Sequence, residues 1–256
     1  MIEIFDAYAS YYDLLYQDKD YEAESVFVEG LLTKYGVPAG GNLLELGSGT
    51  GKHAECFARM GFSVHGVDLS PVMVSSANAK TADEVANQLY FEVGDVRNVR
   101  VNHIFDAVVS LFHVSSYQTT NADLMAMFKT AAIHLKQGGV FLFDCWYGPA
   151  VLSNRPEVRV KKMGNATVDV LRTAEPVMYP NENVVEVNYS VQVKQKKGDH
   201  LIEFSEKHEI RYLFSPEVEL MLELAGFSPV IRHGWMTEDP TGFDSWAATF
   251  VSVKSS

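Results

Sequence analysis

Residues 43–53, with the sequence LLELGSGTGKH, decide the fold of this chain. An apolar run ends there in three glycines at alternate positions, Gly47, Gly49 and Gly51, and an apolar spacing typical of a helix follows. Strand, tight turn and helix start in this order form a corner that binds a nucleotide-like ligand. Glycines let the backbone turn sharply, and the first helical turn leaves N–H donors unpaired. The spacing G-x-G-x-G differs from the G-x-G-x-x-G of dinucleotide sites, which leaves room for a pyrophosphate.

Acidic residues follow the next two predicted strands. Asp68 ends the run 63–67 and precedes a serine cap and a proline that open a helix, in which Met73 either packs on an adenine face or belongs to the core. An acid at the end of the second strand can accept both hydroxyls of a ribose, whichever nucleoside cofactor carries it. The third strand, 89–93, leads into Gly94-Asp95-Val96, and a fourth, 105–110, leads into the loop 111–117. That loop should border the reacting atoms, because ligands of open α/β sheets bind beyond the strand C-termini.

Composition narrows the function. The 256 residues include 21 basic and 33 acidic residues, a formal net charge of −12, which argues against a surface built to bind nucleic acid. Cys56 and Cys145 have no paired spacing, so a reducing cytoplasm is expected. The sequence has no apolar run long enough to span a bilayer and no basic start typical of a signal peptide, so no membrane partner is expected. No group of Cys and His has the spacing of a metal site, so no metal is expected.

The E-x-G-x-G-x-G pattern that begins at Glu45 resembles motif I of the class I S-adenosylmethionine-dependent methyltransferases. The acids at the ends of the following strands suit this cofactor, which carries a sulfonium, an ammonium and two ribose hydroxyls but no phosphate. A glycine-rich turn or an NAD site is the alternative. The resemblance implies an α/β, Rossmann-like fold with a mostly parallel seven-stranded sheet, and adenine recognition by Asp95. The predicted cofactor-binding residues are Tyr21, Glu45, Gly47, Gly49, Gly51, His53, Asp68, Leu69, Met73, Asp95, Val96 and Leu111.

The pattern changes after the fifth strand, 140–144, which follows a helix over 121–135 that we expect to stop at Gly138-Gly139. Alternating stretches between 157 and 213 predict an antiparallel insert of about four strands. A helix from Ser215 and a strand pair, 227–233 and 245–253, then complete the main sheet. The predicted domains are therefore a lid helix and cofactor-binding core over 1–148, the insert over 149–213, and the remainder of the core over 214–256.

The N-terminal residues 3–35 are predicted to be helical, with Tyr8, Tyr12 and Tyr16 along one face. Such a stripe is either half-buried core or a lid whose phenols point into a ligand pocket. Three patterns together resemble the N,N-dimethyltransferases of TDP-amino sugars: Tyr12-Asp13-x-x-Tyr16 followed by Lys19-Asp20-Tyr21, then Gly49-Thr50-Gly51-x-His53, then Phe204-x-Glu206-x-His208. The resemblance covers nearly the full chain, and places Tyr16 near the acceptor amine and Tyr21 near the methionine carboxylate of the cofactor.

The leading hypothesis is N-methylation of an amino sugar or a related amine. An O-methyltransferase acting on a hydroxylated natural product is the first alternative, and a non-catalytic protein that binds S-adenosylmethionine is the second. Methyl transfer from a sulfonium is already downhill, so the main task for an amine acceptor is alignment in a desolvated pocket. Mixed polar and apolar strands in the insert also suggest a homodimer. The candidate catalytic residues are Tyr16, His208 and His113, and the candidate substrate-binding residues are Tyr12, Tyr117, Trp146 and Glu206.

Overall fold

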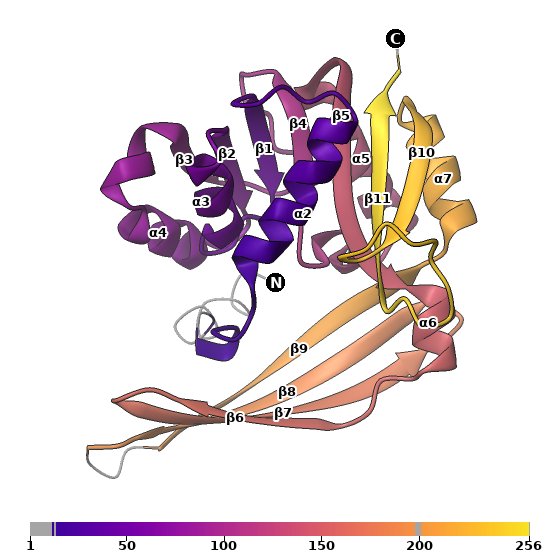
Figure 1. Ribbon diagram of the computed structural model, residues 1–256. Helices are drawn as coiled ribbons and strands as arrows, with labels where there is room; N and C mark the ends of the chain where they lie inside the picture. Colours follow the sequence, from indigo (N-terminus) through magenta and orange to yellow (C-terminus); the bar gives the residue numbers. More distant parts are fainter. Residues whose placement is uncertain (1–11, 13, 198–200, 256) are drawn as a thin grey trace.

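The computed structural model of the chain describes residue 12 and residues 14–197 and 201–255. Within these residues, seven strands form the main sheet in the order β3-β2-β1-β4-β5-β11-β10 (Figure 1). The first five are parallel, and β11 is antiparallel to both of its neighbours. The predicted sheet is therefore confirmed. Its strands are β1 (Asn42–Leu46), β2 (Ser63–Asp68), β3 (Leu89–Val93), β4 (Phe105–Ser110), β5 (Leu135–Tyr147), β10 (Phe227–Gly234) and β11 (Ala247–Lys254).

Helices bury both faces of this sheet, as a continuous apolar run such as that of β4 requires. One cluster of buried side chains joins three of them (α2, α3 and α4) to one face, and a second cluster joins α5 and α7 to the other face. The helices are α2 (Tyr21–Lys34), α3 (Lys52–Arg59), α4 (Pro71–Lys80), α5 (Asn121–His134), α6 (Gly148–Ser153) and α7 (Ser215–Leu224), with 3-10 turns η1 (Asp83–Gln88) and η2 (Val114–Tyr117).

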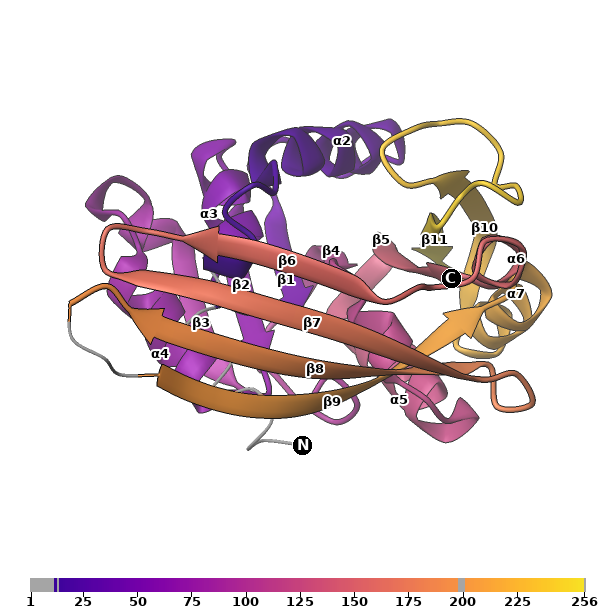
Figure 2. The same ribbon diagram turned by 90° about the horizontal axis from the view of Figure 1, so that it is seen from below.

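The insert after β5 is a long antiparallel sheet, and Figures 1 and 2 show it extending beneath the main sheet. Its strands are β6 (Arg159–Gly164), β7 (Val168–Tyr179), β8 (Val184–Gln195) and β9 (Leu201–Leu213), in consecutive order. The predicted antiparallel insert is present, and β9 also continues the main sheet by pairing parallel with the end of β5, where Trp146 opposes Tyr212.

The two faces of the insert differ. Val170, Val191 and Val193 on the inner face pack with Leu15 from the N-terminal segment of the same chain. On the outer face Lys207 forms ion pairs with Glu186 and Glu209. The apolar face is thus covered within the chain, which removes the reason for which the sequence suggested a partner subunit. The homodimer stays a prediction.

Two predicted elements differ in extent from those in the structure. The helix expected over 3–35 is not continuous, because residues 16–18 form a turn and α2 begins anew at Tyr21 with the Asp20 carboxylate accepting the Ala23 N–H at 2.9 Å. The part before residue 12, including Tyr8, lies outside the described residues. The fifth strand, expected over 140–144, is longer, because β5 pairs with β4 from Leu135 onward and continues to Tyr147. It directly follows α5, which ends at His134, one residue before the expected end. Among the described helices, none has the length and apolar character needed to cross a membrane.

Candidate functional site

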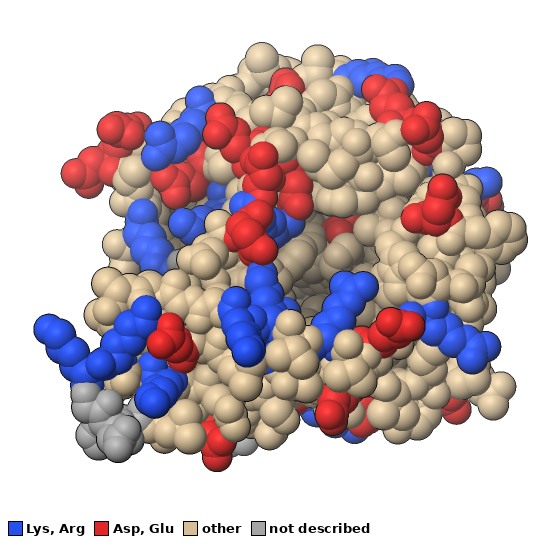
Figure 3. Space-filling view, turned by 60° about the horizontal axis from the view of Figure 1, so that its bottom comes forward, with Lys and Arg blue, Asp and Glu red and all other residues tan. Residues whose placement is uncertain are grey.

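A cavity of about 550 Å³ lies between the C-terminal ends of the parallel strands and the inner face of the insert. Space for a small ligand is typically of this size and is lined by both apolar and polar groups. Figure 3 shows a hollow on this face of the molecule with Lys and Arg side chains beside it. The cavity is lined at one end by the glycine turn and the strand ends, and at the other by side chains of the N-terminal segment and the insert.

The glycine turn has the backbone conformation that the sequence predicted. Gly47, Gly49 and Gly51 have φ values of 82°, 54° and 79°, in the region that glycine alone adopts easily. The N–H groups of Gly47 and Ser48 donate to the Val67 carbonyl at 2.7 and 2.9 Å, which fixes the turn against β2. A Cβ atom on Gly47 would lie 2.5 Å from a Val114 methyl carbon, so the turn and the loop after β4 fit only without a side chain there.

Asp68 supports this turn as well as lining the cavity. Its Oδ2 accepts the Gly49 N–H at 2.8 Å and its Oδ1 accepts the Ser70 N–H at 2.9 Å. Burial raises the pKa of Asp68 above its usual value, and the two N–H donors oppose that rise. A carboxylate has about four acceptor positions, so acceptor capacity remains for ribose hydroxyls.

A buried chain of ionisable groups lies behind the turn. His53 Nε2 is 2.8 Å from Glu24 Oε2, and its Nδ1 is 3.9 Å from Glu45 Oε1; Glu24 in turn pairs with Lys19. Burial, followed by the nearby Asp68 charge, raises the pKa of Glu45 to about 8. One oxygen of Glu45, Oε2, is buried without a partner among the described residues. Glu45 and Gly51 lie outside the cavity wall, whereas His53 and Tyr21 line it.

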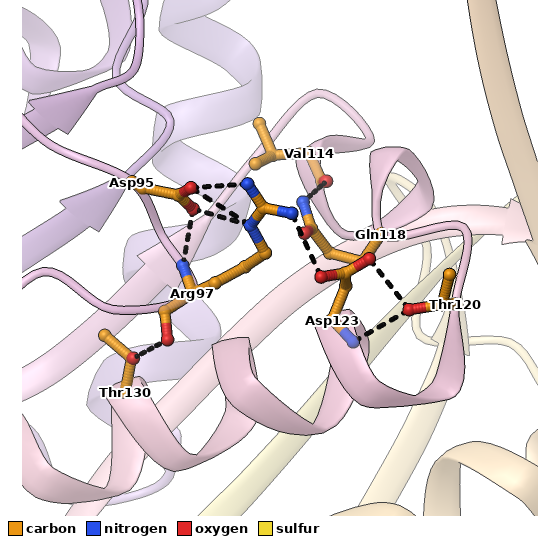
Figure 4. A network of polar contacts seen from close by, with 7 residues as sticks. All are labelled: Asp95, Arg97, Val114, Gln118, Thr120, Asp123 and Thr130. Atoms are coloured by element: carbon orange, nitrogen blue, oxygen red, sulfur yellow. Dashed lines mark hydrogen bonds and ion pairs between the residues drawn. The ribbon is translucent and has the colours of Figure 1, made fainter. Parts of the chain in front are cut away.

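The adenine end predicted from Gly94-Asp95-Val96 contains an ion-pair network (Figure 4). Arg97 donates from Nε and NH2 to the Asp95 carboxylate, at 2.6 Å for the shorter contact, and from NH1 to Asp123 at 3.0 Å. These hydrogen bonds from Arg97 lower the pKa of Asp95. Asp95 therefore has part of its acceptor capacity engaged, and the rest faces the cavity. The other predicted residues at this end, Leu69, Met73, Val96 and Leu111, all line the cavity.

Aromatic side chains, most of them tyrosines, line the end of the cavity formed by the N-terminal segment and the insert. Tyr12, Tyr16, Tyr117 and Trp146 line the cavity as the sequence analysis expected. The rings of Tyr12 and Tyr16 lie 4.8 Å apart, and Tyr16 meets Phe112 edge-on at 4.9 Å. Burial raises the pKa of both Tyr12 and Tyr117 well above 10, so both hydroxyls stay protonated and donate hydrogen bonds at neutral pH.

His208 and Glu206 are neighbours on the inner face of the insert, but only His208 lines the cavity. His208 lines the cavity, yet its Nδ1 is 2.8 Å from the Tyr117 hydroxyl and its Nε2 is 3.2 Å from Glu206 Oε2. Because a carboxylate only accepts, Nε2 carries the proton and Nδ1 accepts from Tyr117. Glu206 does not line the cavity; it is buried behind His208. The pair therefore orients Tyr117, and the prediction that His208 removes a proton loses support because both ring nitrogens are engaged.

His113 follows β4 and lines the cavity between its two ends. Its Nδ1 is 2.7 Å from Oδ2 of Asp144, and its backbone N–H donates to the same carboxylate at 3.0 Å. Burial would raise the pKa of Asp144, but the charge and hydrogen bonds of His113 outweigh it, and the pKa lies below 3.8. The sequence pattern marks Asp144 only as the end of the fifth strand.

Several cavity residues escaped the sequence analysis. Arg159, Arg172 and Tyr189 come from the insert, and Trp246 precedes β11. The Arg172 guanidinium lies 5.0 Å from the Tyr189 ring centre and donates to the Tyr16 hydroxyl at 3.4 Å. The alternation of side chains along β7 and β8 divides their residues between the two faces of the insert. It does not say which of these faces borders the cavity, so the sequence alone could not assign Arg172 and Tyr189 to the site.

Comparisons with known proteins agree with this geometry. Residues 43–139 match the family described as methyltransferase domain. The chain is 30% identical, over 92% of its length and 94% of the relative, to dTDP-3-amino-3,4,6-trideoxy-alpha-D-glucopyranose N,N-dimethyltransferase from Streptomyces venezuelae. The crystal structure of DesVI from the same organism is 27% identical and covers 97% of this chain and 98% of its own, with a TM-score of 0.80. An S-adenosylmethionine-dependent methyltransferase from Clostridium acetobutylicum, 22% identical over 98% and 99% of the chains, shares the fold with a TM-score of 0.80.

The chain belongs to the class I S-adenosylmethionine-dependent methyltransferases. Its cofactor is S-adenosylmethionine, and the resemblance to the amino-sugar N,N-dimethyltransferases is confirmed. The observed residues fit this cofactor: a turn that excludes side chains, an acid at the end of β2, and the buried Glu45 oxygen without a partner behind them.

Proposed function

We propose that this enzyme transfers methyl groups to the amino group of a sugar. The relative from Streptomyces venezuelae acts, by its name, on a nucleotide-linked amino sugar and spans nearly the same length. The observation that carries the proposal is the acceptor end of the cavity, where Tyr16, Tyr117 and Tyr189 surround space next to the cofactor end. Aromatic faces suit the apolar side of a sugar and an ammonium group, and phenols hydrogen-bond to its hydroxyls.

The cofactor supplies a methyl carbon on a positively charged sulfur. Under this proposal, Asp68 accepts from the ribose, Asp95 accepts from adenine, and Tyr21 contacts the amino-acid end. Burial keeps Glu45 largely protonated at neutral pH in the free protein, and a positively charged cofactor at the turn would favour its ionised form. The residues thereby hold the cofactor in one orientation, which is the main contribution to a transfer that needs nitrogen, carbon and sulfur in line.

At the acceptor end, alignment is the task of the phenols. Burial raises the pKa of Tyr189 to about 12, so this hydroxyl, like those of Tyr12 and Tyr117, orients by donating or accepting a hydrogen bond and does not act as a phenolate. Tyr16, from the N-terminal segment, packs on Phe112 of the loop after β4. It therefore lies where the acceptor and the cofactor end would meet.

Arg159 and Arg172 support an acceptor that also carries negative charge. Both line the cavity on the insert side, although the chain as a whole is acidic. A nucleotide-linked sugar has such charge in its diphosphate, which an arginine binds well. We therefore favour a sugar nucleotide over a free sugar.

The proposal is tested by mass spectrometry of S-adenosylmethionine turnover with a panel of acceptors. The panel pairs each amino sugar with the sugar that has a hydroxyl in place of the amine, both free and nucleotide-linked. We expect gains of one or two methyl masses only on the amines, and faster turnover of the nucleotide-linked form. Methylation of the hydroxyl compounds alone would replace the proposal by O-methylation, the alternative that the sequence left open.

We also propose that the chain forms a homodimer. Val160, Val177 and Tyr179 are exposed on the insert, at positions where a second copy would cover them. Light scattering over a range of concentrations should show a dimer that V160K weakens. A monomer at every concentration would reject it.

A further inference from the structure

The loop after β4 has a strained backbone. Phe112 and His113 are consecutive non-glycine residues with φ of 64° each, in the left-handed region. Each such residue costs roughly 1 to 3 kcal/mol and persists only where its surroundings hold it. Strain of this kind is concentrated at functional sites, so the contacts that hold His113 indicate what this loop is built to present.

Asp144 is the group that holds it. This side chain on β5 is about 1% exposed, and its carboxylate accepts the His113 backbone N–H at 3.0 Å while Oδ2 lies 2.7 Å from Nδ1. The direction of the Nδ1–H bond does not meet the geometry of a hydrogen bond to that oxygen, so the contact is an electrostatic one. At this distance a buried carboxylate, which can only accept, still favours the proton on Nδ1. Nε2 is then the unprotonated nitrogen, and it has no partner among the described residues.

The same loop joins the two ends of the cavity. Val114 lies against Gly47 of the cofactor turn, Phe112 packs on Tyr16, and the Tyr117 hydroxyl contacts His208. His113 lies between these contacts and lines the cavity, with a side chain 24% exposed. Its ring therefore lies between the position of the methyl donor and the side chains proposed to hold the acceptor.

Other titratable groups in the described part of the wall are less suited to take a proton at this position. His53 is engaged by Glu24, and His208 by Tyr117 and Glu206. Asp95 and Asp123 are both paired with Arg97 at the adenine end. The hydroxyls of Tyr117 and Tyr189 remain protonated at neutral pH because burial raises their pKa values.

We infer that Asp144 is a positioning residue that fixes the tautomer of His113, so that His113 Nε2 accepts the proton of the acceptor ammonium. This inference rests on the proposed amine acceptor for its catalytic half. The N–H bond breaks with its electron pair left on nitrogen, and that pair forms the new N–C bond while the C–S pair stays on sulfur. The imidazolium returns its proton to water through the open side of the cavity, and the methylated ammonium can lose a proton in the same way before a second transfer.

The positioning half is tested without any acceptor. Two-bond ¹H–¹⁵N spectra of protein labelled at its 8 histidines, with H113Q used to assign the signal, report the tautomer directly. We expect His113 to carry its proton on Nδ1 in the wild type. In D144N, which keeps an oxygen to accept the backbone N–H but loses the charge, we expect a mixed or Nε2-protonated ring. A wild-type ring protonated on Nε2, or a signal unchanged in D144N, would overturn the inference.

The catalytic half is tested by kinetics with the acceptor that the enzyme turns over. H113G should lower kcat about 100-fold or more, the range of a lost general base, with little change in cofactor affinity. Added imidazole should restore part of the rate, because glycine relieves the strained φ and leaves room for the ring. H208G is the matched control; imidazole should not restore its rate, since His208 has an orienting role.

Amine methylation at the full rate by H113G would reject His113 as the base while leaving the proposed function intact. Methylation of hydroxyls alone, with the Nδ1 tautomer present, would reject the proposed function and keep the positioning role of Asp144.

Discussion

The cofactor end and the acceptor end of the cavity are built on different principles. The cofactor end consists of main-chain groups and acids at the ends of neighbouring parallel strands, as in the turn at Gly47 and Gly49 and the carboxylate of Asp68. The acceptor end consists of side chains from the N-terminal segment, the loop after β4 and the insert. A main-chain site tolerates little change, whereas a side-chain site can change its substrate by changing residues.

Substitutions in the glycine turn should have the largest effect. G47A places a methyl group 2.5 Å from Val114 in addition to the strain at φ 82°, whereas G49A meets open space at φ 54°. We expect G47A to lose more than about 3 kcal/mol of stability, from strain and overpacking together, and G49A to lose about 1 kcal/mol. Urea denaturation of the cofactor-free protein gives both values. The double variant G47A/V114A should recover part of the loss, and equal losses in G47A and G49A would show that Val114 is irrelevant.

Loss of the acid at the end of β2 should weaken cofactor binding and leave the acceptor end unaffected. D68N can accept only one of the two N–H groups that the carboxylate accepts, and it loses charge toward the ribose. We expect S-adenosylhomocysteine to bind about 1 to 3 kcal/mol more weakly by calorimetry. An unchanged affinity would contradict the role of Asp68.

Single changes at the acceptor end should show the opposite pattern. Y16F and H208A should lower kcat by about 10- to 100-fold, which corresponds to one orienting hydrogen bond in the transition state, with cofactor affinity preserved. The residual rates should rise with pH as more free amine forms. Complete loss in H208A at every pH would instead identify His208 as a general base.

A further expected effect concerns the pH dependence of stability at the cofactor end. The pKa of Glu45 rises from 4.5 to about 8 on folding. Below about pH 4.5 the carboxyl is protonated in both the folded and the unfolded protein, so its ionisation does not affect stability. As the pH rises from there to about 8, the unfolded state ionises first, and the cofactor-free protein is progressively destabilised. E45Q should gain about 1 to 3 kcal/mol relative to the wild type between about pH 5 and pH 8. If the free energies of unfolding of E45Q and the wild type changed with pH in parallel, Glu45 would have no raised pKa.

Particular residues show which features of the fold and the site could be predicted from the sequence. The glycine turn and the acids Asp68 and Asp95 lie at the cavity or its turn, as the sequence predicts, because each depends on a local pattern. The fifth strand is longer than predicted, because its pairing with β4 begins at Leu135, before the two glycines that mark a stop in the sequence. The N-terminal helix was drawn as continuous, because the cap at Asp20 was not recognised as a new helix start.

The sequence by itself determined the methyltransferase fold and the cofactor end. Parallel strands bring their C-terminal ends to one edge, so a turn and two acids that follow successive strands must meet there. Only the tertiary structure decided the acceptor end. Asp144 meets His113 across 31 residues of chain, and Tyr117 meets His208 across 91. The second contact depends on how the insert is placed against the main sheet, and the first on the pairing of β4 with β5 and the turn that follows β4. No local spacing encodes either contact, and together they separate an engaged histidine from one with a nitrogen facing the cavity.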